Sequence, residues 1–156
     1  ADTWKLAMRG SYAKGHLGVA AAQAKRHIIL EPGSSSGWFI LARTRFRGGQ
    51  PDQALGYLRL SKILAPKQLD IRVALARCLF RLGKFDTALR ENDAAATLGA
   101  MGAQHDFERA RIARAAGRLD LATPLLDRLE AGDKIYREQR RILEFTATVD
   151  DLRAPR

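Results

Sequence analysis

The sequence is poor in cysteine and in long apolar runs, and each shortage limits what the protein can be. Cys78 is the only cysteine among 156 residues, so no intrachain disulfide can form and a cysteine-based metal site is disfavoured. No apolar run reaches the length that spans a membrane, and no signal-peptide pattern is present. We therefore expect no membrane insertion and a cytoplasmic location, although one cysteine is equally compatible with the periplasm. The start at Ala1, without an initiator Met, predicts a processed protein or an excised piece of a longer one.

Acidic residues are also scarce, at 17 against 27 Lys and Arg, which gives a net charge of +10. Such an excess favours anionic partners, namely acidic peptides, nucleic acid or a membrane surface. The 27 basic residues comprise 20 Arg and 7 Lys, a bias that suits forked recognition of carboxylate or phosphate and is also produced by a GC-rich genome. The hydrophobic fraction of 46% is that of a folded chain, and the length suits one domain with a real core.

Residues typical of catalysis form no recognised pattern. The three histidines show no metal-ligand spacing and are predicted to lie on the surface or in turns: His16, His27 and His105. The GSSSG run at 33–37 lacks the G-x-S-x-G spacing of a nucleophile elbow, and is interpreted as a loop in which Ser35 or Ser36 caps the following helix. Cys78 is interpreted as a small packing residue within a helix. We therefore predict no enzyme, no cofactor and no metal.

What the chain does contain is a repeat with a period of 34 residues. An arginine recurs at this interval at Arg9, Arg43, Arg77 and Arg111. A glycine recurs at Gly15, Gly49, Gly83 and Gly117, and an alanine at Ala20, Ala54, Ala88 and Ala122. In this register the repeats are approximately 1–34, 35–68, 69–102 and 103–133.

Each repeat is predicted to be a pair of helices. In the second repeat the first helix has apolar residues at i, i+3, i+4 and i+8, on one helical face: Trp38, Leu41, Ala42 and Phe46. Gly49 is predicted to adopt the left-handed conformation that ends this helix. Ala54 is small enough for two helices to approach closely, and Pro66 stops the second helix. Because no such pair can bury its own apolar face, the repeats must stack.

The pattern resembles the tetratricopeptide repeat. The resemblance covers about residues 1–133 and is carried by residues at six positions of the repeat. These are Trp4 and Trp38 at position 4, Leu41 and Leu75 at position 7, and Ala42, Ala76 and Ala110 at position 8. The glycine and alanine columns occupy positions 15 and 20, and Pro32 and Pro66 occupy position 32. Repeats three and four are less regular, because Arg72 and Asp106 replace the tryptophan, Arg109 the leucine, and Ala100 and Lys134 the proline.

This resemblance implies an all-α fold, a right-handed α-solenoid of stacked antiparallel helical hairpins forming a superhelix. We expect a single domain over residues 1–152. Apolar residues among charges predict a final amphipathic helix at approximately 134–152, which would cap the fourth repeat. Residues 153–156 are expected to form a loose tail.

The resemblance also implies a ligand-binding groove, because in that family the first helix of each hairpin lines a concave surface on which positions 2, 5, 6, 9, 12 and 13 face a ligand. Four of these positions supply a basic groove with interleaved aromatic residues. Position 5 supplies Lys5 and Phe39, and position 9 supplies Arg9, Arg43, Arg77 and Arg111. Position 12 supplies Tyr12, Phe46 and Phe80, and position 13 supplies Arg47 and Arg81. Glu108 precedes Arg111 by three residues and is predicted to pair with it or with Arg77. Arg43 is therefore the best candidate for a free guanidinium.

The spacing limits the shape of the ligand. Packed helices lie about 8–10 Å apart and an extended chain rises about 3.3 Å per residue, so an extended peptide would meet an arginine about every third residue. We predict a protein–protein interaction scaffold for an acidic or carboxylate-bearing peptide. Four alternatives stay open: the arginines form only a solvated face, the groove binds nucleic acid through phosphates and stacked bases, the repeats are an adaptor segment of a larger enzymatic or secretion-related protein, or copies of the chain self-associate.

Overall fold

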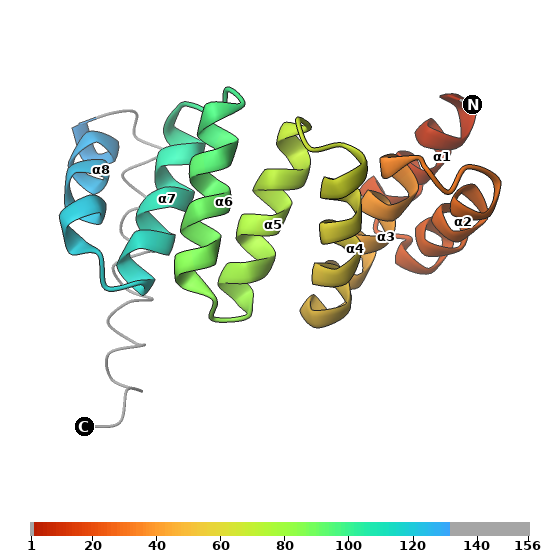
Figure 1. The fold of residues 1–156 in the computed structure, drawn as a ribbon, viewed down its shortest axis with the longest axis horizontal. Coiled ribbons are helices and arrows are strands. Elements are labelled where there is room, and N and C mark those ends of the chain that lie inside the picture. The colour runs from red at the N-terminus through yellow and green to blue at the C-terminus, as the bar shows by residue number, and fades with distance from the viewer. Residues whose placement is uncertain (1, 132–156) are drawn as a thin grey trace. The chain divides into compact units, whose positions relative to one another are not determined.

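The computed structural model describes residues 2–131, and all regular secondary structure in this range is helical. Within each compact unit, neighbouring helices run antiparallel and are joined by short turns (Figure 1). Their bounds are α1 Asp2–Ala13, α2 Leu17–Leu30, α3 Ser35–Arg47, α4 Pro51–Leu64, α5 Leu69–Arg81, α6 Phe85–Thr97, α7 Ala103–Ala115 and α8 Leu119–Ala131. Helices α3, α5 and α7 begin at the first residue of the second, third and fourth repeats.

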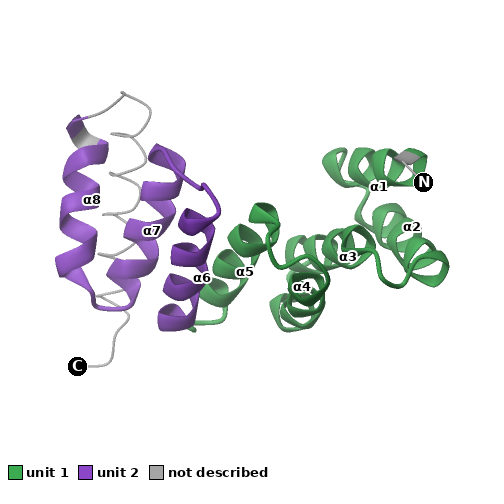
Figure 2. Ribbon diagram, turned by 45° about the horizontal axis from the view of Figure 1, so that its top comes forward, with its two compact units in different colours: residues 1–84 green, residues 85–156 purple. Residues whose placement is uncertain are grey.

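The chain divides into two compact units (Figure 2). The first unit comprises residues 1–84 and contains α1 to α5, whereas the second unit begins at Phe85, the first residue of α6. The prediction of a single domain over 1–152 stays a prediction. The predicted capping helix at 134–152 and the tail at 153–156 lie outside the described residues.

The two structural columns of the repeat behave as predicted. All four glycines of the column have positive φ, between 72° and 79°, and each lies in the turn between the two helices of its hairpin. A side chain at such a position is strained, which explains why glycine recurs there. The four alanines of the column are 0–1% exposed, so they lie where the helices approach closely. The predicted all-α fold class, built of antiparallel helical hairpins, is confirmed.

Each unit has its own apolar core. In the first unit a buried cluster joins α1, α2 and α3 through Met8, Ala24 and Leu41, and the ring of Tyr12 packs against this cluster. In the second unit Ala110 of α7 packs with three leucines of α8. Burial of one leucine side chain stabilises a fold by about 2 kcal/mol, and the packing fixes the helices on which the polar side chains stand.

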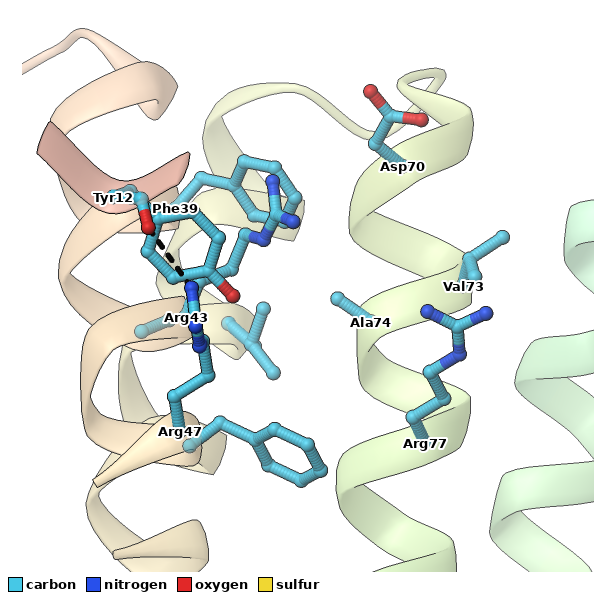
Figure 3. Close-up of a pocket in the computed structure, with 11 residues that line it drawn as sticks. Tyr12, Phe39, Arg43, Arg47, Asp70, Val73, Ala74 and Arg77 are labelled. Carbon is cyan, nitrogen blue, oxygen red and sulfur yellow. Dashed lines mark hydrogen bonds between the residues drawn. The ribbon is translucent and has the colours of Figure 1, made fainter. Parts of the chain in front are cut away.

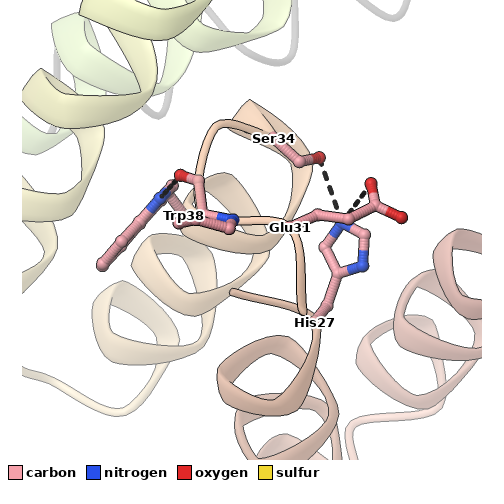
Figure 4. A network of polar contacts seen from close by, with 5 residues as sticks. His27, Glu31, Ser34 and Trp38 are labelled. Atoms are coloured by element: carbon pink, nitrogen blue, oxygen red, sulfur yellow. Dashed lines mark hydrogen bonds and ion pairs between the residues drawn. The ribbon is translucent and has the colours of Figure 1, made fainter. Parts of the chain in front are cut away.

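His27 is buried, so the prediction that every histidine lies on the surface or in a turn is wrong for this residue. It is 1% exposed, and its Nε2 lies 3.0 Å from the Ser34 hydroxyl and 3.9 Å from Oε2 of Glu31 (Figure 4). Gly37 makes room for the ring, since a Cβ there would lie 3.0 Å from His27 Cδ2. His16 is exposed and His105 is half-buried.

The loop before α3 also differs from the prediction that Ser35 or Ser36 caps this helix. Ser34 is the N-cap residue, and its hydroxyl contacts His27 instead of a backbone amide of the helix. Ser35 lies within α3 and donates its hydroxyl hydrogen to Gln68 Oε1 over 3.4 Å. The predicted cap is absent because Ser35 and Ser36 both lie within α3, and the hydroxyl of the N-cap residue Ser34 contacts His27.

Candidate functional site

The first unit contains a pocket of about 320 Å³, lined mainly by side chains of α3 and α5 (Figure 3). Six residues predicted for the groove line it: Tyr12, Phe39, Arg43, Phe46, Arg47 and Arg77. They meet because Phe39, Arg43 and Arg47 follow one another at four-residue intervals on α3, so their side chains share one helical face. Five other predicted residues are not part of the lining: Lys5, Arg9, Phe80, Arg81 and Arg111.

Arg43 is exposed, and aromatic rings hold its side chain. Its Cζ lies 4.3 Å from the ring centroid of Tyr12 and 5.5 Å from that of Phe39. A cation over an aromatic face gains about 0.5–1 kcal/mol at an exposed site, and the ring leaves the positive charge uncompensated. Within residues 2–131, no ion pair to a carboxylate occurs at Arg43, as the sequence predicts. The guanidinium is therefore positioned without being neutralised.

The stacking of arginine on an aromatic ring recurs between consecutive repeats. Arg47 lies 4.8 Å from the ring centroid of Tyr12, and Arg81 lies 5.7 Å from that of Phe46. In both pairs the arginine follows the aromatic residue by 35 positions, so repeat position 13 covers position 12 of the preceding repeat. Nη1 of Arg47 also donates to the Tyr12 carbonyl over 2.8 Å. These contacts link α1 to α3 and α3 to α5, and they cover ring faces that a base would need for stacking.

Lys5 and Arg9 stand on α1, where Lys5 is half-buried and Arg9 is exposed. Phe80 is half-buried on α5, beside the exposed Arg81. The predicted groove residues therefore divide into a group gathered at the pocket and a group outside its lining.

Arg111 belongs to the second unit and is ion-paired. Its Nη2 lies 3.0 Å from Oε2 of Glu108, the partner that the three-residue spacing predicts. Other arginines of this unit also meet acids: Arg109 pairs with Asp93, Arg128 with Asp106 at 3.4 Å, and Arg118 with Asp120 at 3.1 Å.

The charge is distributed unequally along the chain. Residues 1–84 contain 15 Lys and Arg but only four Asp and Glu, whereas residues 85–156 contain 12 basic and 13 acidic residues. The whole net charge of +10 thus comes from the first unit. A ligand attracted by positive charge is therefore drawn to the unit that contains the pocket.

Sequence reasoning missed one acidic residue of the pocket. Asp70 lines the pocket from the first turn of α5, on the same helix as Val73, Ala74 and Arg77 (Figure 3). It occupies repeat position 2, which the family resemblance places among the ligand-facing positions. Asp70 could therefore have been predicted from its repeat position, but the prediction was based on the arginines at position 9.

The described residues contain neither a metal-binding cluster nor a membrane-spanning helix. No cluster of three or more His, Cys, Asp or Glu side chains there could hold a metal ion. None of the helices between residues 2 and 131 is both long and apolar enough to cross a membrane.

A sequence model of the family described as anaphase-promoting complex, cyclosome, subunit 3 matches residues 15–94, just over half of the chain. This family is of the tetratricopeptide type, and the chain belongs to it. No curated protein sequence matches the chain.

Solved structures with the same fold are distant in sequence. PilF of Pseudomonas aeruginosa has a TM-score of 0.72 and 20% identity; the match covers 86% of this chain but only 63% of that chain. A thermophilic tetratricopeptide protein of Thermus thermophilus has a TM-score of 0.72 and 19% identity, over 91% of this chain and 80% of that chain. The first tetratricopeptide domain of Spaghetti (RPAP3), solved bound to the HSP90 peptide SRMEEVD, has a TM-score of 0.70 and 16% identity, over 74% and 94%. These similarities show the fold.

Proposed function

We propose that the protein is a protein–protein interaction scaffold and that its first unit binds an extended acidic segment of a partner. The observation that carries this proposal is Arg43, whose guanidinium is exposed, held on two aromatic rings and not ion-paired within the described range. A carboxylate that meets such a group gains a charge-assisted hydrogen bond, and the arginine needs little reorganisation to form it.

The rest of the pocket suits a peptide. Arg77 stands on the far side of the pocket from Arg43, one helical hairpin further along the chain. Val73 and the ring of Phe46 also line the pocket and offer half-buried apolar surface for the backbone and small side chains of the segment. Acidic residues at about every third position would meet successive arginines. The solved complex of the RPAP3 domain with SRMEEVD supports the proposal, since it is a domain of this fold that holds an acidic peptide.

The proposal is tested by fluorescence anisotropy with a labelled synthetic peptide that has Glu at every third position among Ala and Ser. The variant Arg43→Ala with Arg77→Ala should bind this peptide at least about tenfold more weakly than the wild type, because two charge-assisted contacts are lost. The control is Arg26→Ala with Arg59→Ala, which changes the net charge equally on α2 and α4, outside the pocket lining. Equal affinity of the two double variants would reduce the arginines to a general charge effect and contradict the proposal.

Nucleic acid is the second candidate, because the 15-to-4 excess of basic residues in the first unit suits any polyanion. Base stacking on Tyr12 is disfavoured, because Arg43 and Arg47 both lie over its ring. A labelled single-stranded oligonucleotide in the same assay separates the two. Tight binding of the oligonucleotide with a steep loss of affinity in salt, and no binding of the acidic peptide, would favour nucleic acid.

The partner of this scaffold, its place in a larger protein and its cellular compartment stay predictions. The partner is expected to be an acidic protein segment, and self-association of the repeats is an alternative that light scattering tests. The chain spans less than two thirds of the PilF structure, so a role as an adaptor segment of a larger protein is also a proposal. The cytoplasm is the expected compartment, with the periplasm as the alternative.

A further inference from the structure

We infer that the pocket selects a bipolar segment, in which a Lys or Arg stands directly beside an acidic residue, and that Asp70 binds the basic one. This inference rests on the proposed function and adds a specificity determinant to it. It starts from the one acidic side chain among the residues that line the pocket.

The side chains of α5 at the pocket form a stripe with opposite charges at its two ends. Asp70, Val73, Ala74 and Arg77 are spaced at i, i+3, i+4 and i+7, so they share one face of the helix. Two helical turns separate Asp70 from Arg77, which is about 10 Å along the axis. Val73 and Ala74 lie between them and are half-buried (Figure 3). A segment that crosses α5 over these two residues has an anion on one side and a cation on the other.

Asp70 is available for a ligand. Its side chain is exposed, and it has no hydrogen bond or ion pair to another residue in the described range. A carboxylate in the first turn of a helix is favoured by the helix dipole, which alone would explain an acid at this place. Asp52 occupies the same place on α4 and is also exposed, but it does not line the pocket. Substituting each of these two residues in turn therefore separates stabilisation of the helix by a first-turn carboxylate from an effect of Asp70 on ligand binding.

The geometry of an extended peptide sets the spacing of the two charges. Neighbouring side chains point in different directions in a β-strand and in a polyproline II helix. If an acidic side chain points towards Arg43 and Arg77, the residue directly before or after it is the one that can turn towards Asp70. A second acid at that place would meet the Asp70 carboxylate with like charge, so an uninterrupted acidic run fits this pocket less well than an alternating one.

The experiment compares three labelled peptides that share Glu at every third position and have Lys, Ala or Glu directly after the central Glu. The wild type should bind the Lys peptide about two- to fivefold more tightly than the Ala peptide, as expected for one exposed ion pair, and the Glu peptide more weakly than either. Asp70→Asn should remove this discrimination, so that the Lys peptide no longer binds more tightly than the Ala peptide. Asp70→Lys should reverse the order, and Asp52→Asn should preserve it.

The outcomes distinguish this inference from the proposed function. If the wild type binds the three peptides with equal affinity, or if Asp52→Asn removes the discrimination as completely as Asp70→Asn, the role of Asp70 is overturned and acidic-peptide binding stands. If none of the three peptides binds, the proposed function is overturned and this inference with it. Circular dichroism of each variant confirms that the helices are intact.

Discussion

Arg43 and Arg111 occupy the same repeat position in the two units, but their surroundings differ. Arg43 lies on the rings of Tyr12 and Phe39, whereas Arg111 is ion-paired with Glu108. The residue three positions earlier accounts for the difference, since it is Glu108 before Arg111 and the buried Ile40 before Arg43. Identical residues of one repeat column therefore have different partners in different repeats, and the proposed binding role applies to Arg43 and not to Arg111.

The same difference extends to the whole units. In the second unit Arg109, Arg118 and Arg128 also meet acids, so positive charge there is largely balanced locally. In the first unit Arg47 and Arg81 lie on aromatic rings, which orient the cations and leave the charge to act on a ligand. In the second unit several arginines are thus ion-paired, whereas in the first unit Arg43, Arg47 and Arg81 lie on aromatic rings, as the proposed binding role requires.

The largest expected effect is on the rate at which the thiol of Cys78 is alkylated. Cys78 is the only cysteine of the chain and belongs to the first unit, so its reactivity reports on the opening of that unit alone. Cys78 is fully buried, and its Sγ donates to the Pro51 carbonyl over 3.2 Å. Burial, together with the negative charge of Asp52, raises the pKa of the thiol to about 11. Alkylation requires an accessible thiolate, so iodoacetamide at pH 8 should label the native chain at least about a hundredfold more slowly than the urea-unfolded chain. The raised pKa alone lowers the thiolate fraction by about this factor, and burial of the thiol slows the reaction further. Equal rates would show that the first unit opens readily.

The raised pKa also gives the direction of a pH effect. The folded-state pKa lies above that of the unfolded thiol, so deprotonation favours unfolding. The stabilising contribution is complete below about pH 9 and is lost as the pH rises towards 11. Cys78→Ala removes the titrating group, so the midpoint of urea unfolding of this variant should fall less steeply over that pH window than that of the wild type. Parallel curves would contradict the assignment.

A further prediction concerns a substitution that gives the first unit an ion pair like that of Arg111 and Glu108 in the second unit. Ala74 stands three residues before Arg77, at the position that Glu108 holds before Arg111. Ala74→Glu should pair with Arg77 and add a negative charge to the pocket, which lowers the affinity for the acidic peptide about tenfold. Ala74→Gln is the control of equal size without the charge. Similar losses in both variants would indicate a steric cause and not the neutralisation that the comparison requires.

The smallest expected effect is in the second unit. Arg111→Ala leaves Glu108, which is 13% exposed, without this ion-pair partner, and should lower the free energy of unfolding by about 1 kcal/mol. Adding Glu108→Gln to Arg111→Ala should recover part of this loss, because it removes the negative charge that has lost this ion-pair partner. Urea denaturation measures both values. A double variant that is no more stable than Arg111→Ala alone would mean that the pair adds little cohesion.

Much of the fold was predictable from the sequence, because it depends on residues with one clear physical role. Gly49 takes the left-handed turn and Ala54 lies buried, as their recurrence at 34-residue intervals predicts. The buried state of His27 was not predictable in this way. It depends on the absence of a side chain at Gly37 in the next helix, which makes room for the ring, and a histidine shows no periodicity of its own.

Six residues that line the pocket were predicted from the sequence, but their pairings were not. The exposed Arg43 and its lack of an acidic partner follow from the residues around it in sequence. The contact of Arg47 with the Tyr12 ring and carbonyl joins residues 35 positions apart, and only the packing of α1 against α3 reveals it. The charge difference between the units was present in the sequence, and it becomes meaningful once the boundary at residue 84 is known.

The most direct test of the account maps the acidic peptide onto the two units by nuclear magnetic resonance. The peptide with Glu at every third position is titrated into the ¹⁵N-labelled protein, and shifts are followed for the backbone amides and the arginine Nε–H groups. We predict the largest shifts at Arg43, Arg77 and the amides of Val73 and Ala74, with little change at Arg109 and Arg111. Shifts that concentrate in residues 103–131, or that spread equally over arginines of both units, would contradict the division between a binding unit and a cohesive one.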